Sequence, residues 1–162
     1  MQPQIIDKPE LLIAGCEVPS IHALSPDANN HHVIPQVWDQ LMARLPGLVH
    51  RTNEPMYGLI FQREERSHEH ELWYMAGCAV PADAEISDGF TTQKIPAATY
   101  AVFTHRGPIS GIAETVRHAY REWLPTSDYE LADAPDVELY DERFSCDRND
   151  SEMEYWLPVT RR

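Results

Sequence analysis

The sequence predicts an α+β fold in which two similar βαββ units form one antiparallel sheet, with helices on one side of it. Three observations support this prediction. The order strand, helix, strand, strand occurs twice within 162 residues, at about 1–82 and 90–162. Each copy holds one amphipathic helical pattern that ends at a proline, and the other segments alternate in the manner of strands. We therefore expect a single domain over 1–162.

In the first copy, an extended segment at 11–18 precedes a helical pattern at 34–45. Apolar residues recur there every three or four positions, and Pro46 stops the pattern. Two more extended segments follow, at 57–62 and 71–80. Because the helix has a single apolar stripe, we expect it to lie against one side of the sheet.

The second copy repeats this order with an extended segment at 99–105 and a helical pattern at 112–124, which Pro125 ends. Its last two extended segments are 137–144 and 152–159. This helix also has one apolar stripe. We expect the two helices to cover the same side of the sheet and to leave the other side open.

Composition excludes several functional classes. Thirteen basic residues against 26 acidic ones give a formal net charge of −13 and a pI near 4.9. Such a surface repels phosphate backbones and anionic lipids, so direct binding to nucleic acid or to a membrane is disfavoured. No apolar run approaches the roughly 20 residues of a membrane helix, and the N-terminus lacks the features of a secretion signal. The three cysteines are too far apart for a zinc pattern, and we expect a cytoplasmic protein.

Strand alternation points to a binding site on the open side. Glu154 and Trp156 share one face of the last segment, and Glu71 and Trp73 share the corresponding face of 71–80. The wholly apolar faces of these strands should form the helix-covered core. A strand carboxylate is most often a solvated surface residue. A tryptophan two positions later, in both halves, favours instead an acidic, aromatic-lined cleft.

A carboxylate among aromatic rings suits a lipophilic cation, because each ring contributes about 0.5–2 kcal/mol of cation–π attraction. Strand alternation favours the open side for Tyr140 as well. Tyr100 lies on a predicted strand, and Trp38 lies near the start of a predicted helix. Both are further candidates for the lining, although Trp38 is most simply a core residue of its helical stripe.

Several short stretches carry a family resemblance. They are IPAATYAVFTHRGP at 95–108, WLPTS at 123–127, VELY at 137–140 and EMEYWLPV at 152–159. In this order they resemble GyrI-like small-molecule-binding domains, which are related to AraC-type effector-binding domains. YGL at 57–59 and YMAGCAV at 74–80 resemble the integron-associated branch of these domains.

The resemblance implies a cradle of two βαββ units that binds bulky, lipophilic and often cationic compounds. It also implies that the acidic residue of the final strand is Glu154. Such domains occur in bacterial AraC- and MerR-type regulators and as stand-alone proteins. Because the chain begins with a strand and contains no helix-turn-helix pattern, we expect an effector-binding domain without a DNA-binding domain. It would sequester a compound or signal its presence to a protein partner, and a homodimer is compatible with the sequence.

An enzyme remains the alternative, because some relatives are hydrolases that open strained, electrophilic rings. Glu154 would then act as a general base on water. A metal site at His68-Glu69-His70-Glu71 is the weaker interpretation of that segment, which we expect to be a solvated hairpin tip. No nucleotide-binding motif or Ser-His-Asp signature is present, so we expect no cofactor and no metal.

Overall fold

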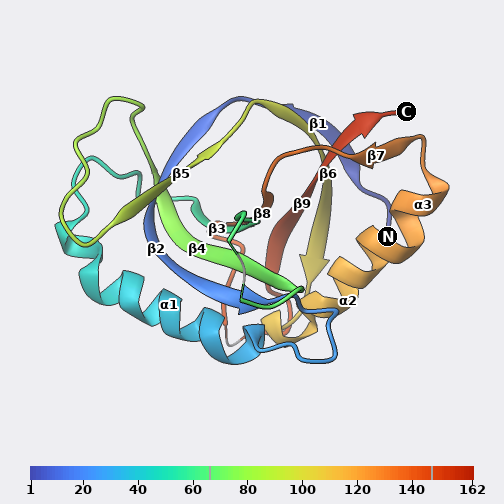
Figure 1. Cartoon of the computed structure of the whole chain (residues 1–162), viewed down its shortest axis with the longest axis horizontal. Coiled ribbons are helices and arrows are strands. Elements are labelled where there is room, and N and C mark those ends of the chain that lie inside the picture. Colours follow the sequence, from blue (N-terminus) through green and yellow to red (C-terminus); the bar gives the residue numbers. More distant parts are fainter. Residues whose placement is uncertain (66, 147) are drawn as a thin grey trace.

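The computed structural model describes residues 1–65, 67–146 and 148–162. Figure 1 shows a curved sheet with helices along its outer side. The elements are β1 (Gln4–Lys8), β2 (Leu11–Ile21), α1 (Asn30–Arg44), β3 (Met56–Phe61), β4 (Glu71–Val80), β5 (Thr91–Ile95), β6 (Ala98–Arg106), α2 (Ile112–Arg117), α3 (Leu124–Thr126), β7 (Tyr129–Leu131), β8 (Asp136–Tyr140) and β9 (Glu152–Arg161). Short 3₁₀ turns at Leu45–Gly47 and Ile109–Gly111 adjoin the helices.

The strands form one antiparallel sheet in the order β1-β6-β9-β8-β3-β4-β2-β5, and the short β7 pairs with β9. The β3–β8 pair lies at the centre. β8, β9 and β6 extend from it on one side, and β3, β4 and β2 extend on the other. Each half of the chain thus contributes three adjacent strands, related by a pseudo-twofold axis between β3 and β8. The predicted α+β class and the repeated βαββ order are confirmed.

The two edge strands exchange partners between the halves. β1 precedes β2 in the chain but pairs with β6 of the second half, whereas β5 precedes β6 but pairs with β2 of the first half. The sequence analysis did not predict either strand, because neither short segment has a distinctive pattern. The exchange links the two halves through backbone hydrogen bonds at both edges of the sheet.

Register shows that both helices cover the same face. Glu138 pairs directly with Gly58 on β3 and with Tyr155 on β9, and Gly58 pairs in turn with Ala76 on β4. Directly paired residues point to the same side of a sheet. Ala76 packs in the cluster under α1 and Tyr155 in the cluster under α2. We call this side the covered face; it confirms the prediction that the helices lie on one side.

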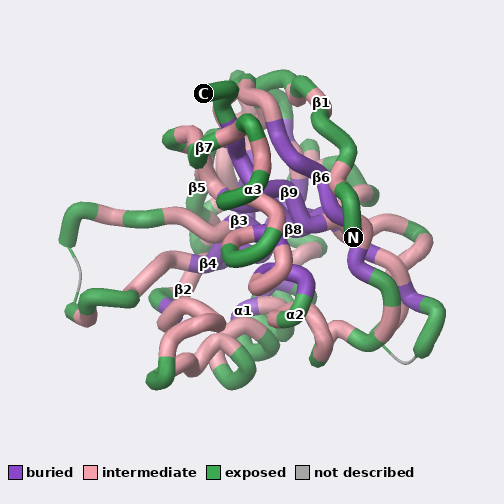
Figure 2. Tube along the Cα trace, turned by 90° about the vertical axis from the view of Figure 1, so that its right-hand side faces the viewer, coloured by how far each residue is buried: buried purple, intermediate pink, exposed green. Residues whose placement is uncertain are grey.

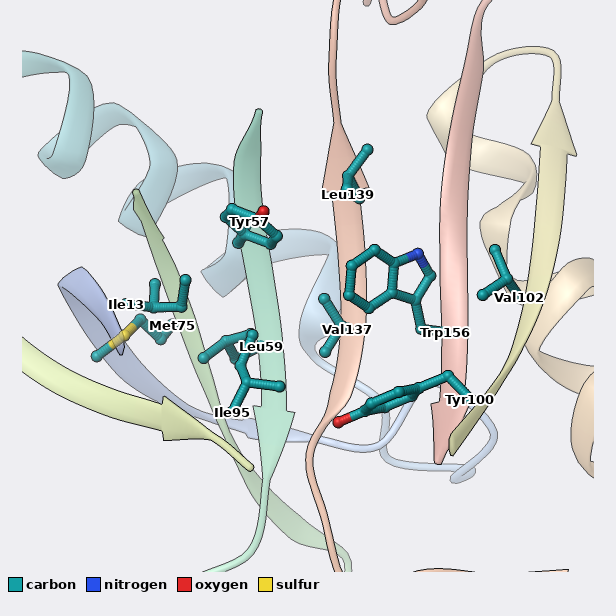
Figure 3. Close-up of a cluster of buried hydrophobic side chains, with 10 residues drawn as sticks. All are labelled: Ile13, Tyr57, Leu59, Met75, Ile95, Tyr100, Val102, Val137, Leu139 and Trp156. Atoms are coloured by element: carbon teal, nitrogen blue, oxygen red, sulfur yellow. The ribbon is translucent and has the colours of Figure 1, made fainter. Parts of the chain in front are cut away.

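The opposite side, the uncovered face, is closed by the curvature of the sheet. Figure 3 shows ten side chains packed together there, from seven strands. They are Ile13, Tyr57, Leu59, Met75, Ile95, Tyr100, Val102, Val137, Leu139 and Trp156, none more than 9% exposed. The expectation that this side is left open was therefore wrong, because a strongly curved sheet packs its inner face against itself. Figure 2 shows the resulting buried centre along β6, β8 and β9.

The second helical segment is continuous but changes its winding. α2 is followed directly by a π-helical segment, His118–Trp123, and then by α3. A π segment has one extra residue in its hydrogen-bonded turn, and such segments often occur at functional sites. Here it carries Tyr120, which reaches the covered face. None of the described helices has the length and apolar character needed to span a bilayer.

Candidate functional site

Two carboxylates, Asp136 and Glu138, lie two positions apart on the covered face of β8. β8 is one of the two central strands of the sheet (Figure 1). Asp136 is 8% exposed and Glu138 is 6% exposed. Tyr140 alternates onto the same face. Strand alternation favoured the uncovered side for Tyr140, and this prediction was wrong. The apolar face of β8, with Val137 and Leu139, packs inside the curved sheet, so its polar face is the one under the helices.

Glu138 is held by a relay of aromatic side chains. The hydroxyls of Tyr74 and Tyr140 both donate hydrogen bonds to Glu138 Oε2, at 2.7 and 2.8 Å. Tyr74 Oη accepts in turn from Trp38 Nε1 of α1, at 2.9 Å. Hydrogen bonds to a charged acceptor are stronger than neutral ones. The relay therefore fixes the position of the carboxylate and connects it to a helix.

Gly58 makes room for this arrangement. A Cβ built at position 58 would lie 2.2 Å from Tyr74 Oη and 2.6 Å from Glu138 Oε2. Both distances are far shorter than van der Waals contact. Any side chain at this position would push the tyrosine and the carboxylate apart, so glycine is needed for their hydrogen bond.

Asp136 has its own pair of phenols. Tyr120, from the π-helical segment, donates a hydrogen bond to Asp136 Oδ2 at 2.7 Å, and Tyr155 of β9 donates to the same oxygen. Tyrosines from β4, β8, β9 and the π-helical segment after α2 thus donate hydrogen bonds to the two carboxylates. Each is fixed through one of its oxygens.

Burial dominates the electrostatics of these groups. It raises the pKa of Asp136 to about 6 although the hydrogen bonds from Tyr155 and Tyr120 act in the opposite direction. Burial also raises the pKa of Glu138, although the hydrogen bonds from Tyr74 and Tyr140 lower it. Removing a carboxylate from water disfavours its charged form. The negative charge of Glu138 further raises the pKa of Asp136.

Neither acid has a cationic partner among the residues that the structure describes. None of the ion pairs within 1–65, 67–146 and 148–162 includes Asp136 or Glu138. All four tyrosine hydrogen bonds go to Oδ2 or Oε2, and no described residue donates to Asp136 Oδ1 or Glu138 Oε1. Buried charges in proteins are normally paired, so two that are not form an unsatisfied anionic site.

Two adjoining cavities open onto these acids. A small inner pocket of about 50 Å³ is lined by residues of β2, α1, β3, β4, α2, β8 and β9, including Glu138. A larger outer cavity of about 560 Å³ lies beside the loop from Leu131 to Pro135. Asp136 lines both. The acids are thus enclosed by the fold and accessible from these cavities.

The structure places Glu154 and Trp156 on the uncovered face, where strand alternation predicted them. Trp156 Nε1 donates to Glu154 Oε2 at 2.8 Å, and Arg143 Nη2 donates to Glu154 Oε1 at 2.9 Å. Trp156 is only 2% exposed. The ammonium of Lys8 lies 4.1 Å from the centre of its ring. Both oxygens of Glu154 are therefore engaged within the protein.

Glu71 and Trp73 do not meet this first pair. If the paired residues are followed from Glu154 across the sheet, the position reached on β4 is Gly77. Gly77 is six residues from Glu71, which corresponds to about 20 Å along the strand. Trp73 lies against the Arg63 guanidinium at 3.9 Å. The expected hollow shared by the two pairs was wrong, because packed core side chains occupy the face between them.

Tyr100, the remaining strand candidate, is fully buried beside Trp156, with ring centroids 5.7 Å apart. Burial raises the pKa of its phenol to about 12. Tyr100, Glu154, Trp156, Glu71 and Trp73 thus belong to the uncovered face, and ligand binding by any of them stays a prediction. Of the seven candidates, Tyr140 and Trp38 join the hydrogen bonds around Glu138 on the covered face, and Trp73 is also among the residues that line the inner pocket.

Sequence reasoning missed the two acids at the centre of this site, together with three of the tyrosines that hold them: Tyr74, Tyr120 and Tyr155. The available signal was the segment DVELY at 136–140, in which acidic and apolar residues alternate. The alternation was interpreted as turning Tyr140 toward the open side of the sheet. Tyrosines at corresponding places in both halves could have indicated that this face is enclosed.

The histidine-rich turn shows contacts with its own neighbours. The rings of His68 and His70 are 5.7 Å apart, and His70 Nε2 lies 3.3 Å from Glu69 Oε1. Within the described part of the chain, no three His, Cys, Asp or Glu side chains are arranged to hold a metal ion.

Comparisons with known proteins agree with the fold. The family model described as GyrI-like small molecule binding domain matches residues 1–160. The transcriptional regulator BrlR of Pseudomonas aeruginosa is 28% identical over 162 residues, which are 98% of this chain and 56% of BrlR. The chain therefore spans about half the length of this curated relative.

Two solved structures have the same fold. SAV2435 bound to tetraphenylphosphonium superposes with a TM-score of 0.77 at 16% identity, over 99% of this chain and 94% of that one. The integron cassette protein VCH_CASS2 of Vibrio cholerae superposes with a TM-score of 0.67 at 16% identity, over 98% and 96% of the two chains.

Proposed function

This chain belongs to the GyrI-like small molecule binding domain family, and we propose that it binds lipophilic cations at Asp136 and Glu138 on its covered face. The observation that carries the proposal is the burial of two carboxylates that have no cationic partner in the described part of the chain. A buried, uncompensated charge costs several kcal/mol. A cationic ligand would offset that cost, whereas an anionic ligand would add to it.

The surroundings of the acids suit a lipophilic ligand. Trp38 and Tyr140 pack edge to face with ring centroids 5.3 Å apart, next to Glu138. Ile34, Ile60 and Val116 add apolar surface to the inner pocket. Aromatic faces attract cations by about 0.5–2 kcal/mol each. The tetraphenylphosphonium named for SAV2435, a protein of the same fold, is a cation of this kind.

A pair of probes with one shape and opposite charges tests the proposal. Tetraphenylphosphonium and tetraphenylborate have nearly the same size and apolar surface. We expect isothermal titration calorimetry to show saturable binding of the phosphonium and none of the borate. Equal binding of both ions would contradict the proposal, because shape and apolar burial alone would then account for affinity.

In the cell, such a domain would sequester a compound or report its presence to a partner. The relay from Glu138 through Tyr74 to Trp38 connects the site to α1 and offers a route for reporting. BrlR is a transcriptional regulator, and this chain corresponds to about half of it. Limited proteolysis with and without tetraphenylphosphonium tests this route, which predicts protection of cleavage sites in α1.

One observation favours hydrolysis as a second candidate function. Asp136 has a pKa of about 6 in an enclosed site, and a carboxyl group with such a pKa can accept a proton from water near neutral pH. Glu154, the base expected from the sequence, has both oxygens occupied. Incubation with a cyclopropane-bearing electrophile, followed by mass spectrometry, would reveal the addition of one water. Loss of that product in Asp136→Asn would support this function.

A further inference from the structure

The inner pocket and the outer cavity are two adjoining compartments. Their linings share four residues: His22, Ile60, Leu72 and Asp136. His22 comes from the segment between β2 and α1, and its ring packs edge to face against Tyr120 at 6.0 Å. Burial lowers the pKa of this imidazole, which favours its neutral form beside the junction. Asp136 therefore lies where the two compartments adjoin.

The two compartments differ greatly in size. About 50 Å³ in the inner pocket accommodates a compact head group, since a single water needs roughly 10–15 Å³ of the same kind of space. About 560 Å³ in the outer cavity falls within the range of pockets for drug-sized molecules. A ligand that fills both is elongated, with a narrow end inside and a bulky body outside.

Both compartments are negatively charged. Glu138 lines the inner pocket, Asp133 lines the outer cavity, and Asp136 lines both. No lysine or arginine is found among the described residues that line either space. Glu138 and Asp136 are more than nine-tenths buried, and each keeps one carboxylate oxygen to which no described residue donates. A ligand with a single charge leaves at least one of these acids uncompensated.

Building on the proposed function, we propose that the preferred ligand is an elongated lipophilic dication. Its compact ammonium group occupies the inner pocket at Glu138, and its bulky aromatic body carries a second positive charge in the outer cavity at Asp136. The two acids are two positions apart on one strand face, which separates them by about 7 Å. The positive centres of the ligand are therefore separated by a short linker of three to five atoms, roughly that distance.

Ethidium and propidium are a matched pair of probes for this proposal. They share the cationic phenanthridinium ring, and propidium adds a quaternary ammonium on a three-carbon arm. We expect propidium to bind at least about tenfold more tightly than ethidium in fluorescence titrations. In Glu138→Gln this ratio should fall to about one, because the inner ammonium loses its partner. In Asp136→Asn both dyes should weaken together and the ratio should persist.

Asp39→Asn is the control, because Asp39 is an exposed residue of α1 and its loss changes the net charge equally. It should leave both affinities unchanged, which excludes general attraction to an acidic protein. The ratio of the propidium and ethidium affinities of the wild-type protein tests the proposal without any variant. The test therefore stands even if circular dichroism shows that Glu138→Gln is misfolded. Equal binding of both dyes, or binding of tetraphenylphosphonium but of neither dye, would overturn the two-compartment proposal alone. If tetraphenylphosphonium fails to bind as well, the proposed function itself fails.

Discussion

Gly58 and Glu138 face each other directly across the central β3–β8 pair, and a Cβ on Gly58 would lie 2.6 Å from Glu138 Oε2. Because Gly58 has no side chain, it leaves the space in which Glu138, from the other half of the chain, accepts a hydrogen bond from Tyr74. The site is built at the pseudo-twofold axis, from both halves.

Gly58→Ala should therefore disturb the site more than an ordinary methyl insertion would. The added Cβ must displace Tyr74 or Glu138, and overpacking of this kind costs about 1–3 kcal/mol of the free energy of unfolding. We expect urea denaturation to show that loss and calorimetry to show weaker binding of tetraphenylphosphonium. Gly47→Ala serves as the control, since its nearest contact would be Phe90 at 4.0 Å. An unchanged affinity in Gly58→Ala would contradict this account of the site.

Tyr140→Phe tests the placement of Tyr140 under the helices. The substitution keeps the ring that packs against Trp38 and Phe144 but removes a hydrogen-bond donor to Glu138. A lost hydrogen bond to a charged group costs about 1.5–3 kcal/mol. We expect this loss of stability at high pH, where Glu138 is ionised, and a smaller loss at low pH, where its raised pKa leaves it protonated.

In this experiment Tyr129→Phe is the comparison, because Tyr129 stacks on Trp123 and is not one of the four tyrosines that donate to the acids. Stabilities of Tyr140→Phe that match those of wild type at both pH values would show that its hydroxyl does not serve Glu138.

Asp136 should give stability a particular dependence on pH. Its folded-state pKa of about 6 lies above the ordinary 3.8, so the folded protein holds this proton more tightly than the unfolded chain. The contribution is fully present below pH 4 and is lost as the pH rises past 6. The whole difference corresponds to about 3 kcal/mol. Asp136→Asn lacks this dependence.

We therefore expect the stability of wild type relative to Asp136→Asn to fall by up to about 3 kcal/mol between pH 4 and pH 7. Urea denaturation of both proteins across this range measures it. A constant difference between them would mean that Asp136 titrates in the folded state as it does in water.

Binding should show the opposite trend with pH. A cation favours the ionised carboxylate, so the affinity for tetraphenylphosphonium should rise by up to about tenfold per pH unit below 6. It should level off above pH 7. Calorimetric titrations from pH 5 to pH 8 measure this profile, and a flat profile would exclude a titrating acid from the site.

The sequence was a good guide to the order of elements and a poor guide to which face encloses the site. Periodicity located both helices and the strands of each repeat, and alternation placed Glu154 with Trp156 correctly on one face. Curvature, however, is a property of the whole sheet and of its exchanged edge strands. It turned the apolar face of Val137 and Leu139 inward and left Glu138 under the helices. Local alternation cannot distinguish these two outcomes.

The π-helical segment shows a similar limit. The periodicity of 112–124 predicted a helix, and a continuous helical segment is present, but its change of winding was not predicted. That change determines where Tyr120 meets Asp136. The acids at the site became recognisable only when tyrosines distant in the sequence were brought against them.

The most direct test of the central claim compares two double variants in calorimetric titrations with tetraphenylphosphonium. Asp136→Asn with Glu138→Gln removes the acids of the covered face, and Glu152→Gln with Glu154→Gln removes the same charge from the uncovered face. We expect the first pair to weaken binding by at least about 30-fold, because truncating a buried charge partner costs 2 kcal/mol or more. The second pair should stay within about threefold of wild type. Loss of binding in the second pair and retention in the first would contradict the claim.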